Sequence, residues 1–429
     1  MKSLTASTFR AADARRPAGF AVAFALVVAG TVQADVIADF NAVGARTATP
    51  PVGVVYPAVT PEEKRTLSFV DLATMHLAMY DAVVAIEGGF QPYAIVPVSP
   101  AAGASSAAAA GAAACAVLQG LFPNRSPQYE ADCTPYQAGS GADVATARGI
   151  TLGIEVGQKM LVDRADDGRD TTENYSPGGG VGDFVPAAPG NPIWHFAPYM
   201  RAFTLSSPAQ FRADGPPALT SVSYAEAFNE VKELGRAGGA ALSPEQLEVA
   251  RFHTENPNLF WPRASRAFLS QPSVLENARL AAMLQVSIGD AILGCFESKY
   301  YFDAWRPRTA IPAAATDGNP ATTAEPGWAP LAASPNHPEY PSGHSCIAGA
   351  VGEVVKSYYG TPKVAFTWDS TATGTTHAYD SIYEMIREIK AARVLGGMHF
   401  RFANDDGVTL GRRTADWVVR NYFGPVGGH

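Results

Sequence analysis

Three short segments in the C-terminal part of the chain carry residue types that suit a tetrahedral oxyanion. They read KYYFDAWRP, PSGH and ARVLGGMH, and they supply Lys299, Arg306, Ser342, Gly343, His344, Arg393 and His399. A multiply charged anion needs several positive donors; arginine offers a planar fork that holds two oxygens, and lysine offers a point charge. Two histidines can divide the roles of ligand or nucleophile and of acid or base. Together the segments predict a site for phosphate-like chemistry.

The first segment is expected at the end of a long, largely buried helix over 274–305. A capping box begins at Ser273, and apolar residues recur behind it at helical spacing. Lys299 and Arg306 lie seven residues apart, which is about two helical turns. Both cations are therefore expected on nearly the same face, and Pro307 prevents the helix from continuing.

The PSGH segment precedes an apolar helical pattern, which places Ser342 or Gly343 at a helix N-terminus. Free backbone N–H groups and the positive end of the helix dipole make such a turn an anion site. Glycine also lets the backbone approach a ligand closely. His344 is expected in the first turn, beside the bound anion.

The third segment closes a helical pattern that carries Arg393 near its end. The glycine pair at 396–397 is expected to stop this helix, so that His399 emerges from the following turn. The last helix is expected to be capped by Asn404 or Asp405. Arg393 and His399 are thereby predicted on two sides of one helix–turn–helix junction.

These segments, in this order, resemble the superfamily of vanadium-dependent haloperoxidases and type 2 phosphatidic acid phosphatases, whose motif reads K-x6-RP, PSGH, SR-x5-H-x3-D. The resemblance is strong over 299–405, and weaker similarity to bacterial haloperoxidase-like proteins extends to 76–87 and 223–235. Ala392 replaces the motif's serine, and Ala403 stands where its aspartate would follow. The resemblance implies an all-α fold, a large helical bundle with long Gly- and Pro-rich loops.

The resemblance also implies vanadate as cofactor, in a site that phosphate can occupy as well. His399 would bind the vanadium, and His344 would be the acid–base group. The vanadate oxygens would be bound by Lys299, Arg306, Ser342, the Gly343 amide and Arg393. Hydrogen peroxide would oxidise halide to hypohalous acid, with Lys299 making one peroxide oxygen electrophilic, and a small organic acceptor would take the halogen.

An exported acid phosphatase is the alternative, with His399 forming a phosphohistidine and His344 acting as leaving-group acid. In the phosphatases the motif aspartate orients the nucleophilic histidine, so Ala403 favours the peroxidase. The long N-terminal helical region and the lack of a predicted membrane span for a lipid substrate also favour it. A third class, a protein that binds oxyanions without turning them over, would keep the cations but would not require His344.

Two neighbours of the motif bear on halide choice. His337 stands five residues before Ser342, where algal bromoperoxidases resemble one another in having histidine and fungal chloroperoxidases in having phenylalanine. It favours bromide or iodide over chloride, although alone it reads equally well as an exposed loop residue. Phe296 occupies the place of a tryptophan in both groups, which predicts a pocket of different shape. Four histidines match no motif and are predicted to be satisfied core or surface residues: His76, His195, His253 and His377.

Residues 1–34 read as a secretory signal, with basic residues, an apolar stretch and a cleavage site after Ala34. The Arg15-Arg16 pair leaves Sec and twin-arginine export open. Without these residues the chain has 28 Lys and Arg against 39 Asp and Glu. An exported, periplasmic or extracellular protein is expected, and the acidic balance argues against nucleic acid as a partner.

Four cysteines in an oxidising compartment favour pairing. Cys115 and Cys133 are 18 residues apart, and a bond between them would be worth about 3 kcal/mol in the chain-entropy model. Cys295 and Cys346 lie close in sequence to Lys299 and His344, where hypohalous acid would oxidise an exposed thiol. Those two are expected to be buried or bonded to each other if the peroxidase assignment is right.

Helical patterns dominate the organisation of the chain, and no internal repeat is visible. A single domain is predicted over 35–429, with an N-terminal helical part, 35–270, and a motif-bearing bundle, 271–429. Long Gly- and Pro-rich coil is predicted over 177–217 and 312–341. The acidic run 163–170 hints at calcium but fails the EF-hand spacing, and is predicted to be a solvated helix end. The predicted helices are 62–87, 102–120, 142–165, 223–236, 243–256, 274–305, 343–359, 381–394 and 405–422.

Overall fold

The computed structural model describes residues 35–50, 65–187 and 192–427. Asp35–His429 form one compact unit. The predicted signal peptide, residues 1–34, lies outside the described residues.

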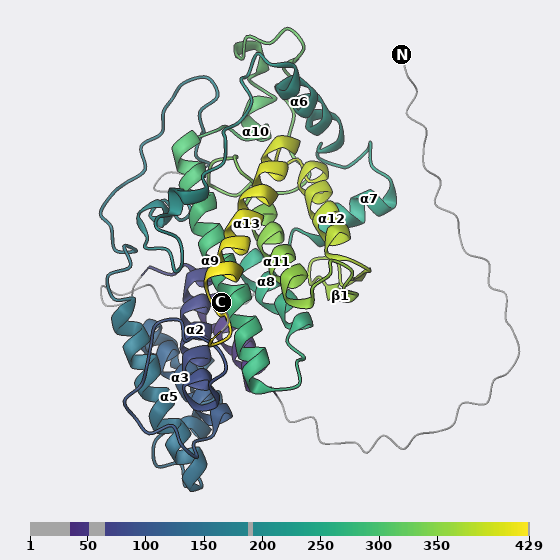
Figure 1. Cartoon of the computed structure of the whole chain (residues 1–429). Coiled ribbons are helices and arrows are strands. Elements are labelled where there is room, and N and C mark those ends of the chain that lie inside the picture. Colours follow the sequence, from purple (N-terminus) through teal and green to yellow (C-terminus); the bar gives the residue numbers. More distant parts are fainter. Residues whose placement is uncertain (1–34, 51–64, 188–191, 428–429) are drawn as a thin grey trace, which may run out of the picture. The chain divides into compact units, whose positions relative to one another are not determined.

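The described residues are mainly helical, so the predicted all-α class is confirmed (Figure 1). Two strands, β1 (Phe366–Asp369) and β2 (Thr376–Tyr379), form an antiparallel hairpin in which Trp368 pairs with His377. The helices are α1 (Val36–Ala48), α2 (Ser68–Glu87), α3 (Ser106–Leu121), α4 (Glu130–Cys133), α5 (Val144–Asp163), α6 (Val222–Leu234), α7 (Pro244–Phe252), α8 (Pro257–Ser265), α9 (Val274–Phe302), α10 (Pro307–Ala310), α11 (Gly343–Tyr359), α12 (Ile382–Leu395) and α13 (Arg401–Asn421).

Each predicted helix is present, but two predicted ends are wrong in ways that affect the site. Helix α9 ends at Phe302, because Asp303 adopts a left-handed backbone with φ of 47°. Arg306 therefore lies in an extended segment before α10, and the argument that it shares a helix face with Lys299 is wrong. Helix α13 begins at Arg401 rather than at 405, so Asn404 lies inside it and does not cap it. Helices α1, α4, α8 and α10 were not predicted.

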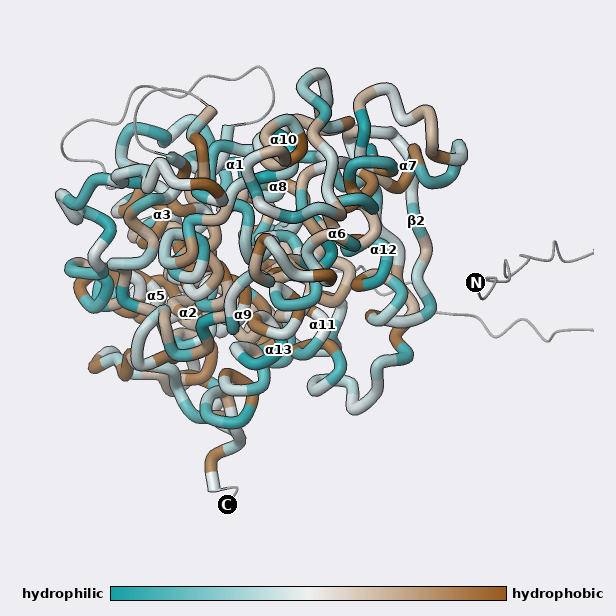
Figure 2. The backbone as a smooth tube through the Cα atoms, turned by 90° about the horizontal axis from the view of Figure 1, so that it is seen from above, coloured by the Kyte–Doolittle hydropathy of each residue, from teal (hydrophilic) through white to brown (hydrophobic). Residues whose placement is uncertain are grey.

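Helix α9 is the centre of the fold. It packs against α2 on one side and against α11 and α13 on the other (Figure 1). Brown, apolar stretches of the chain gather along α2, α5 and α9 in Figure 2, while many outer loops are teal. Helices α2 and α9 have the length and apolar composition of a membrane span, yet most of their residues are buried within the fold, as in core helices.

Helices α11 and α13 pack closely because glycines line their contact. A Cβ on Gly411 would lie 1.9 Å from the carbonyl oxygen of Cys346, and one on Gly407 would lie 2.7 Å from that of Ser342. Only glycine fits at such backbone approaches. The Ser342 N–H also donates to the Ala403 carbonyl oxygen at 2.9 Å. These contacts hold the PSGH turn against the start of α13.

The cysteines fall into two pairs. Cys115 on α3 and Cys133 on α4 form a disulfide. Cys295 and Cys346 are free thiols and are buried. Of the two expected outcomes for Cys295 and Cys346, burial or a bond between them, burial is the one observed.

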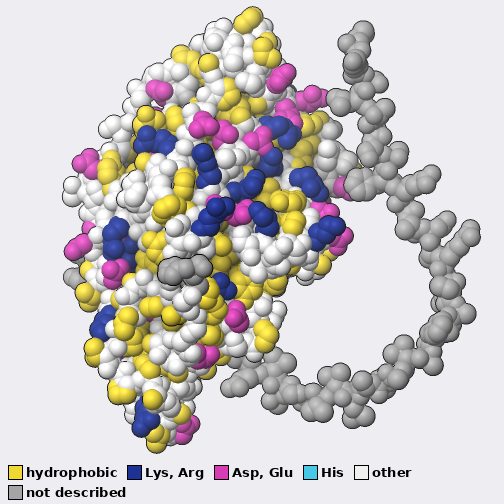
Figure 3. Space-filling view, in the orientation of Figure 1, with side chains coloured by type: hydrophobic (Ala, Val, Ile, Leu, Met, Phe, Trp, Pro, Cys, Tyr) yellow, Lys and Arg dark blue, Asp and Glu magenta, His cyan; other side chains and the backbone are white. Residues whose placement is uncertain are grey.

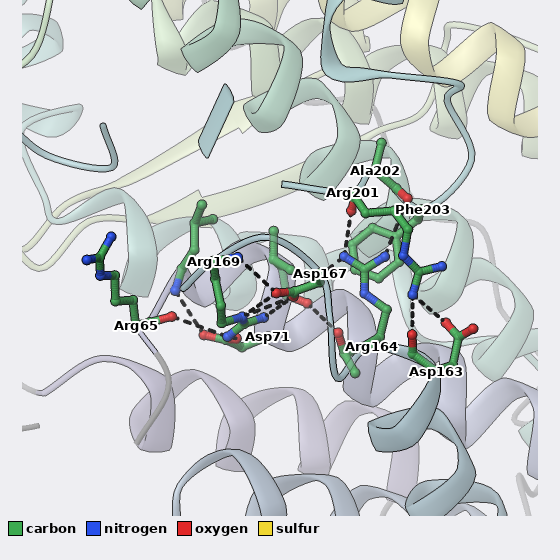
Figure 4. A network of polar contacts seen from close by, with 12 residues as sticks. Arg65, Asp71, Asp163, Arg164, Asp167, Arg169, Arg201, Ala202 and Phe203 are labelled. Carbon is green, nitrogen blue, oxygen red and sulfur yellow. Dashed lines mark hydrogen bonds and ion pairs between the residues drawn. The ribbon is translucent and has the colours of Figure 1, made fainter. Parts of the chain in front are cut away.

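The acidic run after α5 is not simply a solvated helix end. Asp167 is only 1% exposed, and Arg164 and Arg169 are also buried. Arg169 donates to Asp167 and, at 2.7 Å, to Asp71 on α2, which forms the network in Figure 4. The buried charges of this segment are thus neutralised inside the protein, whereas Asp163 and Arg201 pair at the surface. We call the following six residues the aspartate–arginine network: Asp71, Asp163, Arg164, Asp167, Arg169 and Arg201.

Candidate active site

A cavity of about 360 Å³ lies where the three motif segments meet. His344 and Arg393 line it, and so does His399, with the backbone of Gly343 beside them. The rest of the wall is mixed. It has aromatic side chains, Phe69, Trp194, Phe296 and His337, and a polar stretch that includes Thr254, Glu255, Asn256 and Asn258. The structure therefore brings six of the sequence-predicted site residues to one cavity: Phe296, His337, Gly343, His344, Arg393 and His399.

Lys299, Arg306 and Ser342 do not line this cavity but are fully buried beside it. Arg306 donates through Nε to the His337 carbonyl oxygen at 2.7 Å and through Nη1 to that of Met398 at 3.0 Å. Both of these partners belong to the cavity wall. Arg306 is therefore held directly behind the wall, where its charge acts on the cavity through one layer of atoms.

The Lys299 ammonium is bound by three carbonyl oxygens. Nζ donates to Pro338 and Glu339, each at 3.0 Å, and to Pro341. An ammonium has three N–H donors, so all of them are used in this arrangement. Lys299 fixes the backbone that leads into the PSGH turn and adds positive charge, but it makes no direct bond into the cavity.

Helix α11 begins at Gly343, as predicted, and its N-terminal turn has unused donors. Ser342 is the N-cap residue, yet its side chain makes no capping bond, and its Oγ is buried without a partner among the described residues. A Cβ built on Gly343 would meet nothing within 4 Å, so space lies open in front of this turn. A helix N-terminus with open space and an unpartnered hydroxyl suits an anion.

The three buried cations have no carboxylate in ion-pair contact among the described residues. Burial lowers the pKa of Lys299 to about 8, that of Arg306 to about 9 and that of Arg393 to about 10. Arg393 donates through Nη1 to the His253 carbonyl oxygen at 2.8 Å, and its Nε is buried without a partner. A pocket wall with this much unbalanced positive charge fits a bound oxyanion.

Exposed cations elsewhere are paired differently. Figure 3 shows Lys and Arg side chains gathered around α13, with Asp and Glu among them. Arg401 pairs with Glu230, and Arg420 with Asp416, in contact with solvent. The lack of a carboxylate partner is thus a property of the cavity's cations and not of this chain's arginines in general.

A carboxylate does orient His399, and it comes from an unexpected position. His399 Nδ1 lies 3.0 Å from Glu339 Oε1, which also accepts the Phe400 N–H at 3.0 Å. With Nδ1 held as the donor, Nε2 is the nitrogen left for a ligand. Burial raises the pKa of Glu339 to about 7, although Lys299 and Arg306 lower it.

Asn404 and Asp405, the polar residues that follow Ala403, do not replace the motif aspartate at His399. Asn404 donates to the Phe400 carbonyl oxygen at 2.9 Å and accepts from Ser345. Asp405 pairs with Lys390. Both point away because α13 begins at Arg401 and carries them along its first turn.

Both site histidines are held in the neutral form. Burial, the positive charge of Arg393 and that of His253 lower the pKa of His344 well below its usual value. Burial and the charges of Arg306 and Lys299 do the same to the pKa of His399. A bound anion would oppose these positive charges, so anion binding would raise the pKa of both rings.

The remaining wall residues were only partly foreseen. His337 is buried rather than exposed, and its ring lies 5.1 Å from that of Phe296. Trp194 packs edge-on against Phe296 at 4.9 Å, and its backbone is left-handed, with φ of 51°. His253 also lines the cavity, although its sequence surroundings match no motif.

Known proteins resemble the chain in sequence and in fold. Residues 279–427 match the family model of the VCPO second helical-bundle domain. The vanadium chloroperoxidase of Curvularia inaequalis is 28% identical over 29% of this chain, and the match spans 28% of that relative's length. A bacterial vanadium-dependent iodoperoxidase structure superposes with a TM-score of 0.74 at 21% identity, covering 92% of this chain and 97% of that one. A holo-type bacterial vanadium-dependent chloroperoxidase gives a TM-score of 0.66 at 17% identity, covering 87% and 94%.

The structural likeness shows a shared fold, and the match over 279–427 includes all three motif segments. Over these residues the chain is similar to the vanadium chloroperoxidase family, and the match does not extend to the residues before 279.

Proposed function

We propose that this protein is a vanadate-dependent haloperoxidase, which oxidises halide with hydrogen peroxide to hypohalous acid. The observation that carries the proposal is a neutral imidazole, His399, held by Glu339 at a cavity whose three nearby cations contact no carboxylate in the part of the chain that the structure describes. The family match over 279–427 supports the same chemistry. Export and a small organic acceptor, as expected from the sequence, are part of the proposal.

Vanadate fits the donors that the cavity offers. His399 Nε2 would ligate the vanadium, and the oxygens would be bound by Arg393, Ser342 Oγ and the Gly343 amide. Arg393 Nε and Ser342 Oγ are buried atoms without partners among the described residues, which an oxyanion would supply. Lys299 and Arg306 would stabilise the anion by their charge from behind the wall.

When bound, vanadate supplies a fully oxidised centre that takes up hydrogen peroxide and makes one peroxide oxygen electrophilic toward halide. His344 is the residue for the proton transfers. Because burial keeps its imidazole neutral, it can accept the proton that peroxide loses on binding. Glu339 keeps the His399 ring in one tautomer, and the aromatic wall limits water around the reacting atoms.

Bromide or iodide is the proposed halide. His337 lines the cavity beside Phe296, and Arg306 Nη2 lies 3.0 Å from its Nδ1. A cation bound to this ring adds positive charge to the wall that a halide would approach. Phe296 and Trp194 form a polarisable aromatic surface on the same side, which suits large halides better than chloride.

An exported acid phosphatase is the second candidate, and one observation favours it. Ala403 was an argument against a nucleophilic His399, because the motif aspartate is missing. Glu339 provides a carboxylate on His399 Nδ1 from another part of the chain, and this removes that argument. Phosphate would then use the same donors as vanadate, with His344 as the leaving-group acid.

One paired assay separates the candidates. The protein loaded with orthovanadate would be given bromide or iodide with hydrogen peroxide, and the vanadate-free protein a phosphomonoester. Halide oxidation by the loaded form supports the proposal, whereas hydrolysis alone reverses the ranking. His344→Ala is expected to keep orthovanadate binding while turnover falls by about 100-fold or more. Equal turnover in this variant would contradict the role of His344.

A further inference from the structure

A chain of alternating carboxylates and imidazoles leads from the cavity to the surface through α7, β2 and α12. Helix α12 packs against α7 and against β2, and α7 and α12 can be followed in Figure 1. The chain consists of His253, Glu388, His377 and Glu248, in that spatial order. None of these residues belongs to the three motif segments, and the proposed mechanism has not used them.

Hydrogen-bond distances join all four side chains. His253 Nε2 lies 3.0 Å from Glu388 Oε1, and His377 Nδ1 lies 2.8 Å from the same oxygen. The other nitrogen of His377, Nε2, lies 2.6 Å from Glu248 Oε2. Each histidine thus offers one nitrogen to Glu388, and the His377 ring bridges two carboxylates.

Exposure is lowest at the inner end of this chain and highest at the outer end. The side chain of His253 is 1% exposed, those of Glu388 and His377 are 22% and 16% exposed, and that of Glu248 is 31% exposed. The inner end lies at the cavity, which His253 lines together with His344 and His399. Its Nδ1 is buried and has no partner among the described residues. The outer end meets solvent at Glu248.

The packing holds the rings in place. His377 stacks on Phe252 with ring centroids 3.8 Å apart, and Tyr379 donates to Glu388 at 2.6 Å. Hydrogen bonds from His253, Tyr379 and His377 lower the pKa of Glu388 to about 2, although burial raises it. Glu388 is therefore an ionised acceptor between two imidazoles, which is the arrangement that passes protons between rings.

We propose that Glu248, His377, Glu388 and His253 form a proton relay between solvent and the active-site cavity. The proposal rests on the proposed haloperoxidase function, in which hydrogen peroxide, halide and one proton give hypohalous acid and water. Halide loses two electrons and peroxide gains them, so one proton must enter the cavity per turnover. The relay provides a path other than the cavity mouth, through which peroxide and halide enter.

The proton steps balance along the chain. A proton from solvent reaches His377 Nε2 through Glu248, and the proton on His377 Nδ1 passes to Glu388 Oε1. When His253 carries its ring proton on Nδ1, Glu388 passes the proton to His253 Nε2, and His253 releases the Nδ1 proton into the cavity toward His344. Each ring then holds its proton on the other nitrogen, and rotation of the ring or exchange of its proton restores the starting tautomer before the next turnover.

The test compares His377→Ala with Tyr379→Phe, each in the full chain loaded with orthovanadate. Both variants remove a hydrogen bond to Glu388, but only the first interrupts the path. Turnover of iodide and hydrogen peroxide by H377A is expected about 10-fold below wild type in dilute buffer. Added imidazole is expected to restore it to within about 2-fold, with the solvent deuterium isotope effect returning to the wild-type value. Y379F is expected to stay within about 2-fold of wild type.

A purely structural role for His377 would not respond to imidazole, so a loss that imidazole fails to restore overturns the proposal. Wild-type turnover in H377A overturns it as well. Glu248→Gln, at the exposed end, repeats the imidazole test in case H377A does not fold. If the wild-type protein itself oxidises no halide, the proposed function fails. If the wild-type protein oxidises halide and both H377A and E248Q turn over as fast as it does, only the relay fails.

Discussion

Arg169 and Arg393 are both buried, but their charges are balanced in different ways. Arg169 donates to Asp167 and Asp71 at 2.7 to 3.0 Å (Figure 4). These carboxylates raise its pKa, although burial alone would lower it. Arg393 has no carboxylate in contact among the described residues, and burial lowers its pKa to about 10. The charged form of arginine is therefore stabilised by carboxylates at Arg169, whereas at Arg393 burial destabilises it.

The difference separates a structural cluster from a binding site. Removing one partner of a buried ion pair is strongly destabilising because a charge is left unpaired. In the aspartate–arginine network the chain supplies the partners itself, from α2 and from the loop after α5. At the cavity the cations have carbonyl oxygens as acceptors but no carboxylate in contact among the described residues, so a bound anion would balance their charge.

The largest effect on stability is expected from a substitution in the aspartate–arginine network. Asp167→Asn removes the carboxylate shared by Arg164 and Arg169. The free energy of unfolding is expected to fall by about 3–5 kcal/mol, measured by urea denaturation. Orthovanadate affinity of the folded variant should be unchanged. Asp166→Asn is the matched control, because Asp166 is the exposed neighbour; equal stability of the two variants would mean that the network is not what stabilises this region.

The second prediction concerns Lys299, which is buried beside the cavity, and the pH dependence that it gives to the free energy of unfolding. Burial lowers the pKa of Lys299 from 10.5 to about 8. Between these values the unfolded chain binds the lysine proton and the folded chain does not, so the free energy of unfolding should rise with pH from about 8 to about 10.5. The rise attributable to Lys299 is about 3 kcal/mol at most.

Lys299→Met isolates this contribution. Other groups that titrate in this range, such as the tyrosines, are common to both proteins, so the difference between the two stability curves reports on Lys299. In phosphate-free buffer the wild-type curve should rise relative to that of K299M. Parallel curves would show that Lys299 is not destabilised by burial, and would weaken the comparison with Arg169.

The third prediction separates binding from stability. Arg393→Met removes an unpaired charge, so stability without anion should be unchanged or higher. Orthovanadate and phosphate affinity should fall by about 10- to 100-fold, the value of a charge-assisted hydrogen bond. Calorimetric titration measures it, and Arg387→Met, exposed on the same helix, is the control. A destabilised R393M with normal anion affinity would mean that Arg393 is structural, like Arg169.

The sequence was sufficient to predict that these cations and histidines lie close together, because they belong to short segments whose spacing sets local structure. The helix start at Gly343 and the turn that presents His399 follow from proline, glycine and capping patterns. It was not sufficient for Arg306, since the left-handed residue Asp303 ends α9 early and redirects the chain. Which cations reach the cavity directly depends on that redirection.

Contacts between segments that are far apart in the chain could not be predicted from the sequence. Glu339 lies 60 residues before His399 and was overlooked, since the expected carboxylate was sought within the motif. His253 and His377 were read as satisfied histidines, which describes their hydrogen bonds but not their position between cavity and solvent. Asp167 was assigned to solvent, because nothing near it in sequence shows that Asp71 and Arg169 pack around it.

The smallest predicted effect concerns Glu339, the carboxylate that contacts His399. Glu339 contacts an imidazole rather than a guanidinium, so losing its charge should affect the ring more than the fold. Burial raises the pKa of Glu339 to about 7. Near neutral pH the folded protein thus already tolerates the protonated form, and Glu339→Gln should change the free energy of unfolding by less than about 1 kcal/mol, unlike Asp167→Asn.

Orthovanadate affinity is where Glu339→Gln should differ from wild type. The partner that orients a metal-bound histidine typically contributes 10- to 100-fold to metal affinity, and we expect about 10-fold, because the glutamine oxygen can still accept the Nδ1 proton. Glu353→Gln, a buried carboxylate on α11 that pairs with Lys356, is the control. Nitrogen chemical shifts of His399 provide a second readout, since the proton should remain on Nδ1 only while an acceptor faces it. Unchanged affinity together with an unchanged tautomer would show that the Glu339 charge is not needed, and that the positive wall alone sets how strongly the anion is bound.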